Sequence, residues 1–248
     1  MKRIYVLSVC ILLLVLSSCK FSETIHINED GSGDMSFSFD GSQLMQIGAD
    51  SMGETGDVVL DSTIVFKDYL EAKKDSIATL SEAEQKQLKA LENFKMHMLM
   101  DPNTKKMVID INTEFKDVDE LEDMYKVLSK ANELNDKGTA KTSPAGNMGV
   151  AEGTEVHYTF KKNIFKRTVK VVDRELLEAT KDSLGDSEMI LAASTYTLNY
   201  HFPKKIKSVS LKNAMFSEDH KSFTAELSFK DYVTNPESLS VEVVLEDE

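Results

Sequence analysis

Cys19 has the most clearly defined chemistry in this chain of 248 residues, because an export-type leader ends at it. Residues 1–3 carry two positive charges, residues 4–16 form a short apolar run, and small residues at 17–18 lead into the cysteine. A membrane-spanning helix needs about 20 apolar residues, so this run is too short to remain as an anchor. The order of charge, apolar run and small residues predicts a cleaved signal peptide over residues 1–18.

The four residues Leu16-Ser17-Ser18-Cys19 resemble a bacterial lipobox, with serine in place of the more usual glycine or alanine before the cysteine. This resemblance implies that Cys19 is acylated and becomes the first residue of the mature protein. The membrane would then be a partner through the N-terminal acyl chains, and two or more chains hold stably. The alternative is an ordinary secretory signal with a chance cysteine. Lys20 is not the aspartate that signals inner-membrane retention, which favours the outer membrane of a Gram-negative envelope.

The other cysteine, Cys10, lies within the predicted signal peptide. Once that peptide is removed and Cys19 is acylated, no thiol remains for a disulfide, a nucleophile or a soft metal site. An exported domain without disulfides depends on its core. With 41% hydrophobic residues, the 230 residues left after removal of 18 from 248 can form one.

Metal-binding patterns are weak, and the sequence predicts no metal and no cofactor. Residues 28–33 imitate the start of a calcium loop, but Phe39 stands where that loop needs glutamate. Three methionines in the segment 96–100 could bind copper(I), yet alternation places all three on one side of a strand, which favours core packing. No two of the five histidines have the spacing of a ligand pair: His26, His97, His157, His201 and His220.

Catalytic patterns are also missing, so we predict a protein that is not an enzyme. Residues 30–33 contain a serine between glycines, but they bend between two predicted strands and do not open a helix. The 42 acidic residues would permit many carboxylate pairs on paper, and an acidic surface explains them equally well. A hydrolase of envelope glycans or lipids stays open as the alternative function.

The charge of the chain disfavours nucleic acid as a partner. The net charge is −13, and removal of Lys2 and Arg3 with the signal changes it to −15. Binding to nucleic acid needs clustered basic residues that neutralise phosphates. The negative charge is concentrated in residues 20–153, which carry 14 basic and 26 acidic residues, whereas residues 154–248 carry 13 and 16.

A basic hairpin is the second feature with binding chemistry. Four basic side chains surround aromatic and aliphatic residues in the segment 160–167: Lys161, Lys162, Lys166 and Arg167. Lysines beside exposed apolar residues could contact an anionic lipid headgroup or an acidic envelope protein. The alternative is that the apolar residues face the core while the basic residues protect a strand edge or tip.

Alternating apolar residues predict the hairpins that position these groups. The first joins residues 23–27 to 35–39, the second 95–100 to 106–115, and the third 155–161 to 164–172. Later strands are predicted at 195–202, 206–211, 215–216, 222–229 and 239–245. Helical spacing predicts helices over 62–94 with a second start at Ser81, from Asp117 onward, over 174–184 and over 187–193.

The segment 136–153 is rich in glycine and small residues and nearly free of bulky apolar ones, which predicts a flexible loop. We expect residues 19–248 to form a single lipid-anchored domain that contains this loop. The alternative is two subdomains, residues 20–135 and 154–248. Hairpins interleaved with helices predict an α+β fold, an antiparallel β-sheet with helices packed on one face.

Three stretches of sequence, together with the lipobox, have the layout of a known type of protein. They are the turn "NEDGSGDMSFSF", the helix start "FKDVDELEDM" and the ending "YHFPKKIKSVSLKNAMFSEDHKSFTAELSF". They resemble envelope lipoproteins of the LppM type. The resemblance implies an α+β domain that binds lipids, and it assigns no functional residue except Cys19. The sequence thus predicts a non-catalytic lipoprotein of the bacterial cell envelope that binds a lipid or protein partner.

Overall fold

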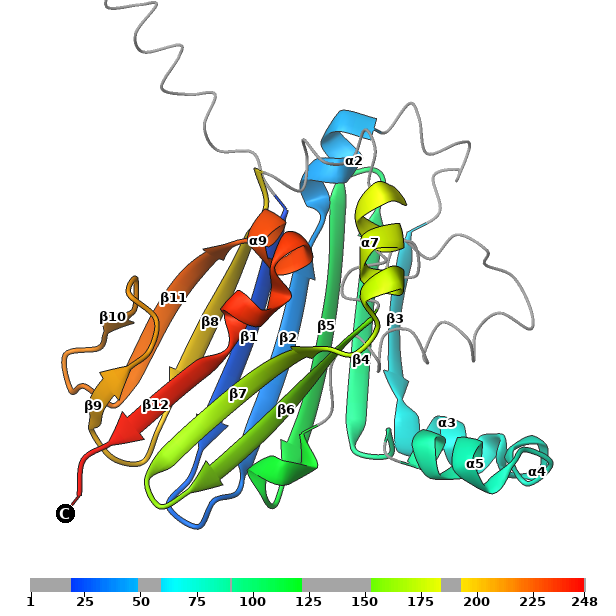
Figure 1. Cartoon of the computed structure of the whole chain (residues 1–248). Helices are drawn as coiled ribbons and strands as arrows, with labels where there is room; N and C mark the ends of the chain where they lie inside the picture. The colour runs from blue at the N-terminus through cyan, green and yellow to red at the C-terminus, as the bar shows by residue number, and fades with distance from the viewer. Residues whose placement is uncertain (1–18, 49–58, 90, 122–152, 184–192, 248) are drawn as a thin grey trace, which may run out of the picture.

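The computed structural model of the chain describes residues 19–48, 59–89, 91–121, 153–183 and 193–247. These residues form two β-sheets, a large one and a small one, with short helices mainly at their ends (Figure 1). One hydrophobic core contains buried residues from both sheets. The predicted α+β class with mostly antiparallel sheets is confirmed.

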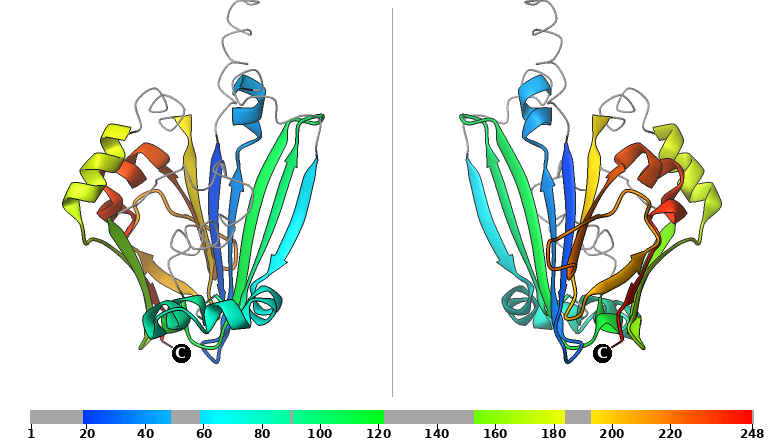
Figure 2. Two further views of the ribbon diagram at one scale, coloured as in Figure 1. Left: turned by 90° about the vertical axis from the view of Figure 1, so that its right-hand side faces the viewer. Right: turned by 90° about the vertical axis from the view of Figure 1, so that its left-hand side faces the viewer.

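The large sheet has eight strands, and its β3–β4 edge extends beyond the small sheet (Figures 1 and 2). In spatial order the strands are β10 (Met215–Phe216), β11 (Ser222–Ser228), β8 (Thr195–His201), β1 (Lys20–Ile27), β2 (Gly33–Asp40), β5 (Lys106–Phe115), β4 (Phe94–Asp101) and β3 (Leu60–Val65). The small sheet has the order β6 (Thr154–Lys161), β7 (Ile164–Val171), β12 (Val241–Leu245) and β9 (Ile206–Val209).

Within the described residues, all strand pairs are antiparallel except β1 with β8, which run parallel. A parallel pair needs a long crossover connection, and here the chain between residues 27 and 195 supplies it. Strands from both sides of the segment 136–153 therefore share the large sheet. Most of that segment, residues 136–152, lies outside the described residues.

Alternation of side chains explains which face of each strand is buried. In β1, Phe21 and Ile25 point inward and are buried, while Ser22 and Thr24 point outward and are half-buried. The predicted hairpin of β1 and β2 is confirmed, and Ser32 of its turn donates a backbone hydrogen bond to the Asp30 carboxylate at 3.0 Å. The other two predicted hairpins, β4 with β5 and β6 with β7, are also confirmed.

The helices are short and lie mainly at the ends of the sheets (Figures 1 and 2). α9 packs on the inner face of the large sheet, where Phe229 stacks on Phe21 with 4.0 Å between ring centroids. The α-helices are α2 (Ser42–Gly48), α3 (Phe66–Ala72), α4 (Lys74–Ile77), α5 (Glu82–Lys89), α7 (Arg174–Ser183) and α9 (Phe229–Thr234). Two 3₁₀-helices are η1 (Val118–Glu120) and η3 (Pro236–Leu239).

One predicted helix began too early. Residues 62–65 belong to the edge strand β3, because Thr63, Ile64 and Val65 are β-branched and pair with β4. The predicted second start at Ser81 agrees with α5, which begins at Glu82. After Asp117 only η1 is described, and the remainder of that predicted helix lies outside the described residues. Most of the predicted helix at 187–193 lies outside them as well.

Candidate functional site

Cys19 lies immediately before β1 and belongs to the edge of the core. The residue is 3% exposed, and its carbonyl oxygen accepts a hydrogen bond from the Thr195 backbone nitrogen at 3.1 Å. Burial raises the pKa of the Cys19 thiol, although a hydrogen bond with Ser194 acts in the opposite direction. In the folded chain the sulfur is therefore a poorly accessible, protonated thiol and a weak nucleophile.

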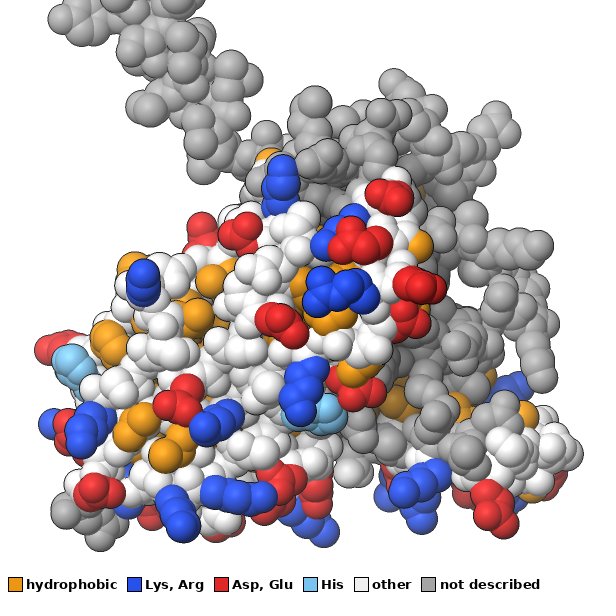
Figure 3. All heavy atoms as spheres, in the orientation of Figure 1, with side chains coloured by type: hydrophobic (Ala, Val, Ile, Leu, Met, Phe, Trp, Pro, Cys, Tyr) orange, Lys and Arg blue, Asp and Glu red, His pale blue; other side chains and the backbone are white. Residues whose placement is uncertain are grey.

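Two lysines of the predicted basic hairpin lie on its exposed side and are paired with acidic residues. Lys161 contacts Asp119 of η1 at 3.0 Å, and this hydrogen bond raises the pKa of Lys161. Lys166 contacts Glu242 of β12 at 2.7 Å. The positive charge that each of these two lysines offers to a binding partner is therefore already partly compensated. Figure 3 shows basic and acidic side chains mixed over the face of the molecule that carries the small sheet.

Lys162 occupies the turn between β6 and β7. Its φ is 53° and that of Asn163 is 60°, so both residues adopt the left-handed conformation of a two-residue hairpin turn. Lys162 is exposed, and among the described residues it takes part in no ion pair. Asn163 donates to Asp247 at 3.1 Å, which holds the turn against the end of the chain.

Arg167 departs from the prediction for the basic hairpin, because it is 1% exposed and faces the core. Successive side chains of a strand point to opposite faces, so Arg167 points inward next to the outward-pointing Lys166. It cannot contact a ligand at the surface. Its guanidinium forms an ion pair with Glu23 of β1, with Nη2 at 3.2 Å from Oε2.

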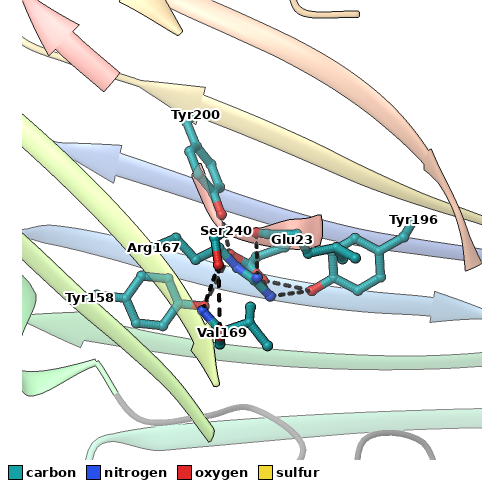
Figure 4. Close-up of polar contacts among 8 residues, drawn as sticks. Glu23, Tyr158, Arg167, Val169, Tyr196, Tyr200 and Ser240 are labelled. Carbon is teal, nitrogen blue, oxygen red and sulfur yellow. Dashed lines mark hydrogen bonds and ion pairs between the residues drawn. The ribbon is translucent and has the colours of Figure 1, made fainter. Parts of the chain in front are cut away.

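Glu23 is the centre of a buried polar cluster between the two sheets (Figure 4). Its carboxylate accepts hydrogen bonds from the hydroxyls of Tyr158 at 3.1 Å, Tyr196 at 2.6 Å and Tyr200. Arg167 also donates from Nη1 to the Leu239 carbonyl oxygen at 2.9 Å. The cluster thus joins β1 and β8 of the large sheet to β6, β7 and η3.

The electrostatics of the cluster favour the charged pair. Burial alone would raise the pKa of Glu23, but Arg167 and the hydroxyls of Tyr196 and Tyr200 outweigh it, and the pKa lies below its ordinary value. Burial and then the Glu23 charge raise the pKa of Tyr200, so this hydroxyl stays a hydrogen-bond donor. A buried pair with its hydrogen bonds satisfied connects the sheets and leaves little free capacity for a ligand.

The sequence contained a signal for this cluster. Glu23 has the same alternation phase as the buried Phe21 and Ile25, and Arg167 has the same phase as Phe165 and Val169. A buried charge at an inward position requires an opposite charge nearby, because burying an unpaired charge costs much free energy of folding. Alternation along each strand thus marks Glu23 and Arg167 as inward charges, but it does not show that they are each other's partner.

One serine–histidine contact bears on the alternative of a hydrolase. On the outward face of the large sheet, Ser222 Oγ lies 2.8 Å from His201 Nδ1, and such a contact is the first requirement for an activated nucleophile. The ring of His26 lies 5.7 Å from that of His201 and contacts Asp34 at 3.1 Å. Among the described residues, no carboxylate forms a hydrogen bond with His201, so the orienting third group is not in place.

The methionine-rich strand β4 packs as the alternation predicts. Met96 is buried, and Met98 and Met100 are partly buried against the core. His97 lies on the opposite face of the strand, where its Nε2 is 2.9 Å from Asp61. The described part of the chain contains no group of three side chains suited to a metal, and none of its helices is long and apolar enough to cross a membrane.

No protein-family model and no curated protein matches the chain. Among solved structures, the folded domain of the Mycobacterium tuberculosis LppM protein, determined by NMR, is similar with a TM-score of 0.36 and 10% sequence identity. The similarity covers 94% of this chain and 92% of that one. At this level it assigns no residue to a role, so a function has to rest on the residues of the chain itself.

Proposed function

We propose that this chain is a lipid-anchored protein of the bacterial cell envelope whose folded domain binds a lipid or protein partner without catalysing a reaction. The position of Cys19 carries the proposal. The residue directly follows the export-type leader at residues 1–18 and directly precedes the first strand of the fold. A cleavage site at the boundary between leader and domain is what an acylated N-terminal cysteine requires.

The charge of the mature chain supports attachment through acyl chains. A net charge of −15 after loss of residues 1–18, from −13 in the full chain, repels anionic headgroups. A surface-bound domain of this charge needs a hydrophobic anchor, and two or more acyl chains provide a stable one. Lys20, in place of an aspartate, favours the outer membrane.

The anchor is tested by the intact mass of the protein purified from its native membrane, with Cys19→Ala as the control. The expected mass is that of residues 19–248 plus acyl chains, and the variant should lose the acyl mass and leave the membrane fraction. Separation of inner and outer membranes on a density gradient tests the location. A mature N-terminus at another residue, or an unmodified Cys19, contradicts the anchor.

Partner binding is assigned to the exposed side of the basic hairpin, without Arg167. Changing Lys161, Lys162 and Lys166 together to glutamine should weaken binding to vesicles that contain phosphatidylglycerol or to an acidic co-purifying protein. The loss should shrink as salt rises, because the Debye length falls from about 10 Å at 0.1 M to about 3 Å at 1 M. Native mass spectrometry of the detergent-extracted protein identifies which lipid or protein co-purifies.

The matched control removes the same charge elsewhere. Lys67, Lys73 and Lys74 of the α3–α4 region are exposed, and one of them, Lys74, is paired with Glu71 much as Lys161 is paired with Asp119. Changing these three to glutamine should leave binding unaltered. Equal losses for the two triple variants would indicate an effect of net charge alone, and the hairpin would then be an ordinary solvated strand edge.

A hydrolase is the second candidate, and the contact between Ser222 and His201 is the observation that favours it. An activated serine should react covalently with a fluorophosphonate probe, which adds a defined mass to Ser222. Ser222→Ala should abolish the labelling and any hydrolysis of envelope glycans or lipids. If wild type stays unlabelled under conditions that label a serine hydrolase, a serine hydrolase that uses Ser222 is excluded.

A further inference from the structure

No flexible stretch separates Cys19 from the folded domain. The next residue, Lys20, is already paired with Asp40 of β2 on one side and Thr195 of β8 on the other. The backbone nitrogen of Thr195 also bonds to the Cys19 carbonyl oxygen at 3.1 Å. Any group that holds Cys19 therefore holds the end of the large sheet directly.

Strand register shows which elements surround this end, called the Cys19 end below. β2 stops at Asp40 beside Lys20 and continues into α2, and β11 stops beside Thr195 and continues into α9. Asp40 also pairs with Val108, so the β4–β5 turn at residues 102–105 lies just beyond it. Figure 1 shows α2, α9 and this turn together at the end where β1 begins.

The opposite end of the molecule carries the other hairpin turns. β1 ends at Ile27 and turns back through residues 28–32. The Lys162–Asn163 turn lies at this end as well. The Asn163 carbonyl oxygen accepts a backbone hydrogen bond from Leu245 at 2.8 Å. The next residue, Glu246, donates at 2.9 Å to Lys205, which lies just past the end of β8. The eight residues of β1 span about 26 Å at about 3.3 Å per residue.

The surface of the Cys19 end suits contact with a bilayer. Among the described residues placed there by the register of the large sheet, four are basic and three acidic, in a chain of net charge −13. They are Lys20, Lys105, Lys106 and Lys230 with Asp40, Asp101 and Asp231. Beyond the end of β7, α7 and the residue before it add two basic and four acidic side chains at this end, so the total of six basic and seven acidic residues is still close to neutral (Figures 1 and 2). Two exposed apolar residues, Val59 at 48% and Leu60 at 42%, lie at the same level, since Leu60 pairs with Met100.

We infer that the acylated Cys19 holds this end flat against the bilayer, with the strands of the large sheet rising from it, and this rests on the proposed anchor. The balanced charge avoids the repulsion that the rest of the chain would meet, and Val59 and Leu60 face the headgroup region. The Lys162–Asn163 turn then lies about 26 Å from the bilayer surface, the length of β1. This distance exceeds the Debye length of about 8 Å at physiological salt. The basic hairpin therefore faces an anionic partner away from the bilayer that carries the protein.

Two exposed turns of the same sheet provide a matched pair of probe positions. Asn103 lies in the β4–β5 turn at the Cys19 end, and Glu29 lies in the β1–β2 turn at the opposite end. Because the mature lipidated protein has no other thiol, Asn103→Cys and Glu29→Cys each accept one fluorophore. The labelled lipoproteins are reconstituted into phosphatidylethanolamine–phosphatidylglycerol vesicles that contain a lipid with a nitroxide on its headgroup.

The nitroxide should quench the probe at position 103 and leave the probe at position 29 as bright as in vesicles without nitroxide. A third form carries about 15 Gly and Ser residues inserted between Cys19 and Lys20, with an r.m.s. length of about 22 Å. In this form the difference between the probes should disappear. Equal quenching of both probes, or of neither, in the protein without the insert overturns the orientation while the acyl mass on Cys19 is intact. Absence of that mass overturns the anchor and the orientation together.

Discussion

Replacement of Arg167 by methionine tests the buried ion pair most directly. Methionine keeps much of the side-chain volume but removes the positive charge, so the Glu23 carboxylate stays buried with only hydroxyl donors. Breaking a buried pair in this way costs about 3–5 kcal/mol of unfolding free energy. The neighbouring Lys166→Met is the matched control, because its pair with Glu242 is about half exposed and contributes about 0.2–1 kcal/mol.

The unfolding free energies of the wild type and of Arg167→Met should change with pH in opposite directions. In the wild type the pKa of Glu23 is lowered, so its contribution to stability is present above the unfolded value of about 4.3 and is lost as pH falls through the folded pKa. Without Arg167, burial raises the pKa of Glu23, and the variant loses stability as pH rises above about 4.3. The difference in unfolding free energy should therefore be small near pH 4 and largest at pH 7.

Urea unfolding of the detergent-solubilised protein, followed by circular dichroism and tyrosine fluorescence because the chain has no tryptophan, measures these free energies. If Arg167→Met does not fold at pH 7, Tyr196→Phe gives a milder test. Its expected cost is about 1.5–3 kcal/mol, set mainly by loss of the 2.6 Å hydrogen bond to Glu23, since the contact from Arg167 to the same hydroxyl is long at 3.5 Å. A cost for Arg167→Met no larger than that for Lys166→Met, or one independent of pH, would refute the reasoning.

Three other predictions concern the turn, an exposed histidine and the domain organisation. Lys162→Asn should raise the free energy of unfolding by up to about 1 kcal/mol, because asparagine adopts positive φ more readily than lysine; a destabilised variant in urea titrations would contradict this. A hydrogen bond to Asp61 raises the pKa of His97, so the stabilisation from this pair is present below about pH 6.5 and lost as pH rises through the folded pKa. In Asp61→Asn the NMR-titrated pKa of His97 should fall, and an unchanged value would assign the shift elsewhere. Limited proteolysis should cut first within 136–153 and leave the two fragments associated, whereas fragments that separate and melt cooperatively alone would indicate two domains.

The hairpins could be predicted from the sequence because their information is local. Alternation along β6 and β7, with a two-residue turn at Lys162–Asn163, fixes both strands and their register. The edge strand β3 carries little apolar alternation in its six residues, so the sequence predicts helix there, whereas pairing with β4 decides its conformation. Such tertiary pairing is not visible within a short window of sequence.

The inward position of Arg167 illustrates a different limit. Arginine is typical of a surface, and Arg167 is close in sequence to exposed lysines, but the alternation of β7 puts Lys166 and Arg167 on opposite faces. Glu23, the partner of Arg167, lies 144 residues away in the chain. The contact depends on the packing of two sheets, so the sequence could indicate that Arg167 needs an acid but could not identify the acid.

If the chain is exported as proposed, the parallel pairing of β1 with β8 has a consequence for the order in which its strands form. Lys20 pairs with Asp40 and with Thr195, so β1 lies between a neighbour close in sequence and one that an exported chain would deliver much later. Contacts of such high sequence separation form slowly. Until residues 195–201 arrive, one edge of β1 is unpaired and the sulfur of Cys19 lacks the cover of Ser194. In a chain acylated at Cys19 as proposed, this topology would leave the thiol open to the acylating enzyme until the last strands pair, after which the acylated residue lies at the end of the completed sheet.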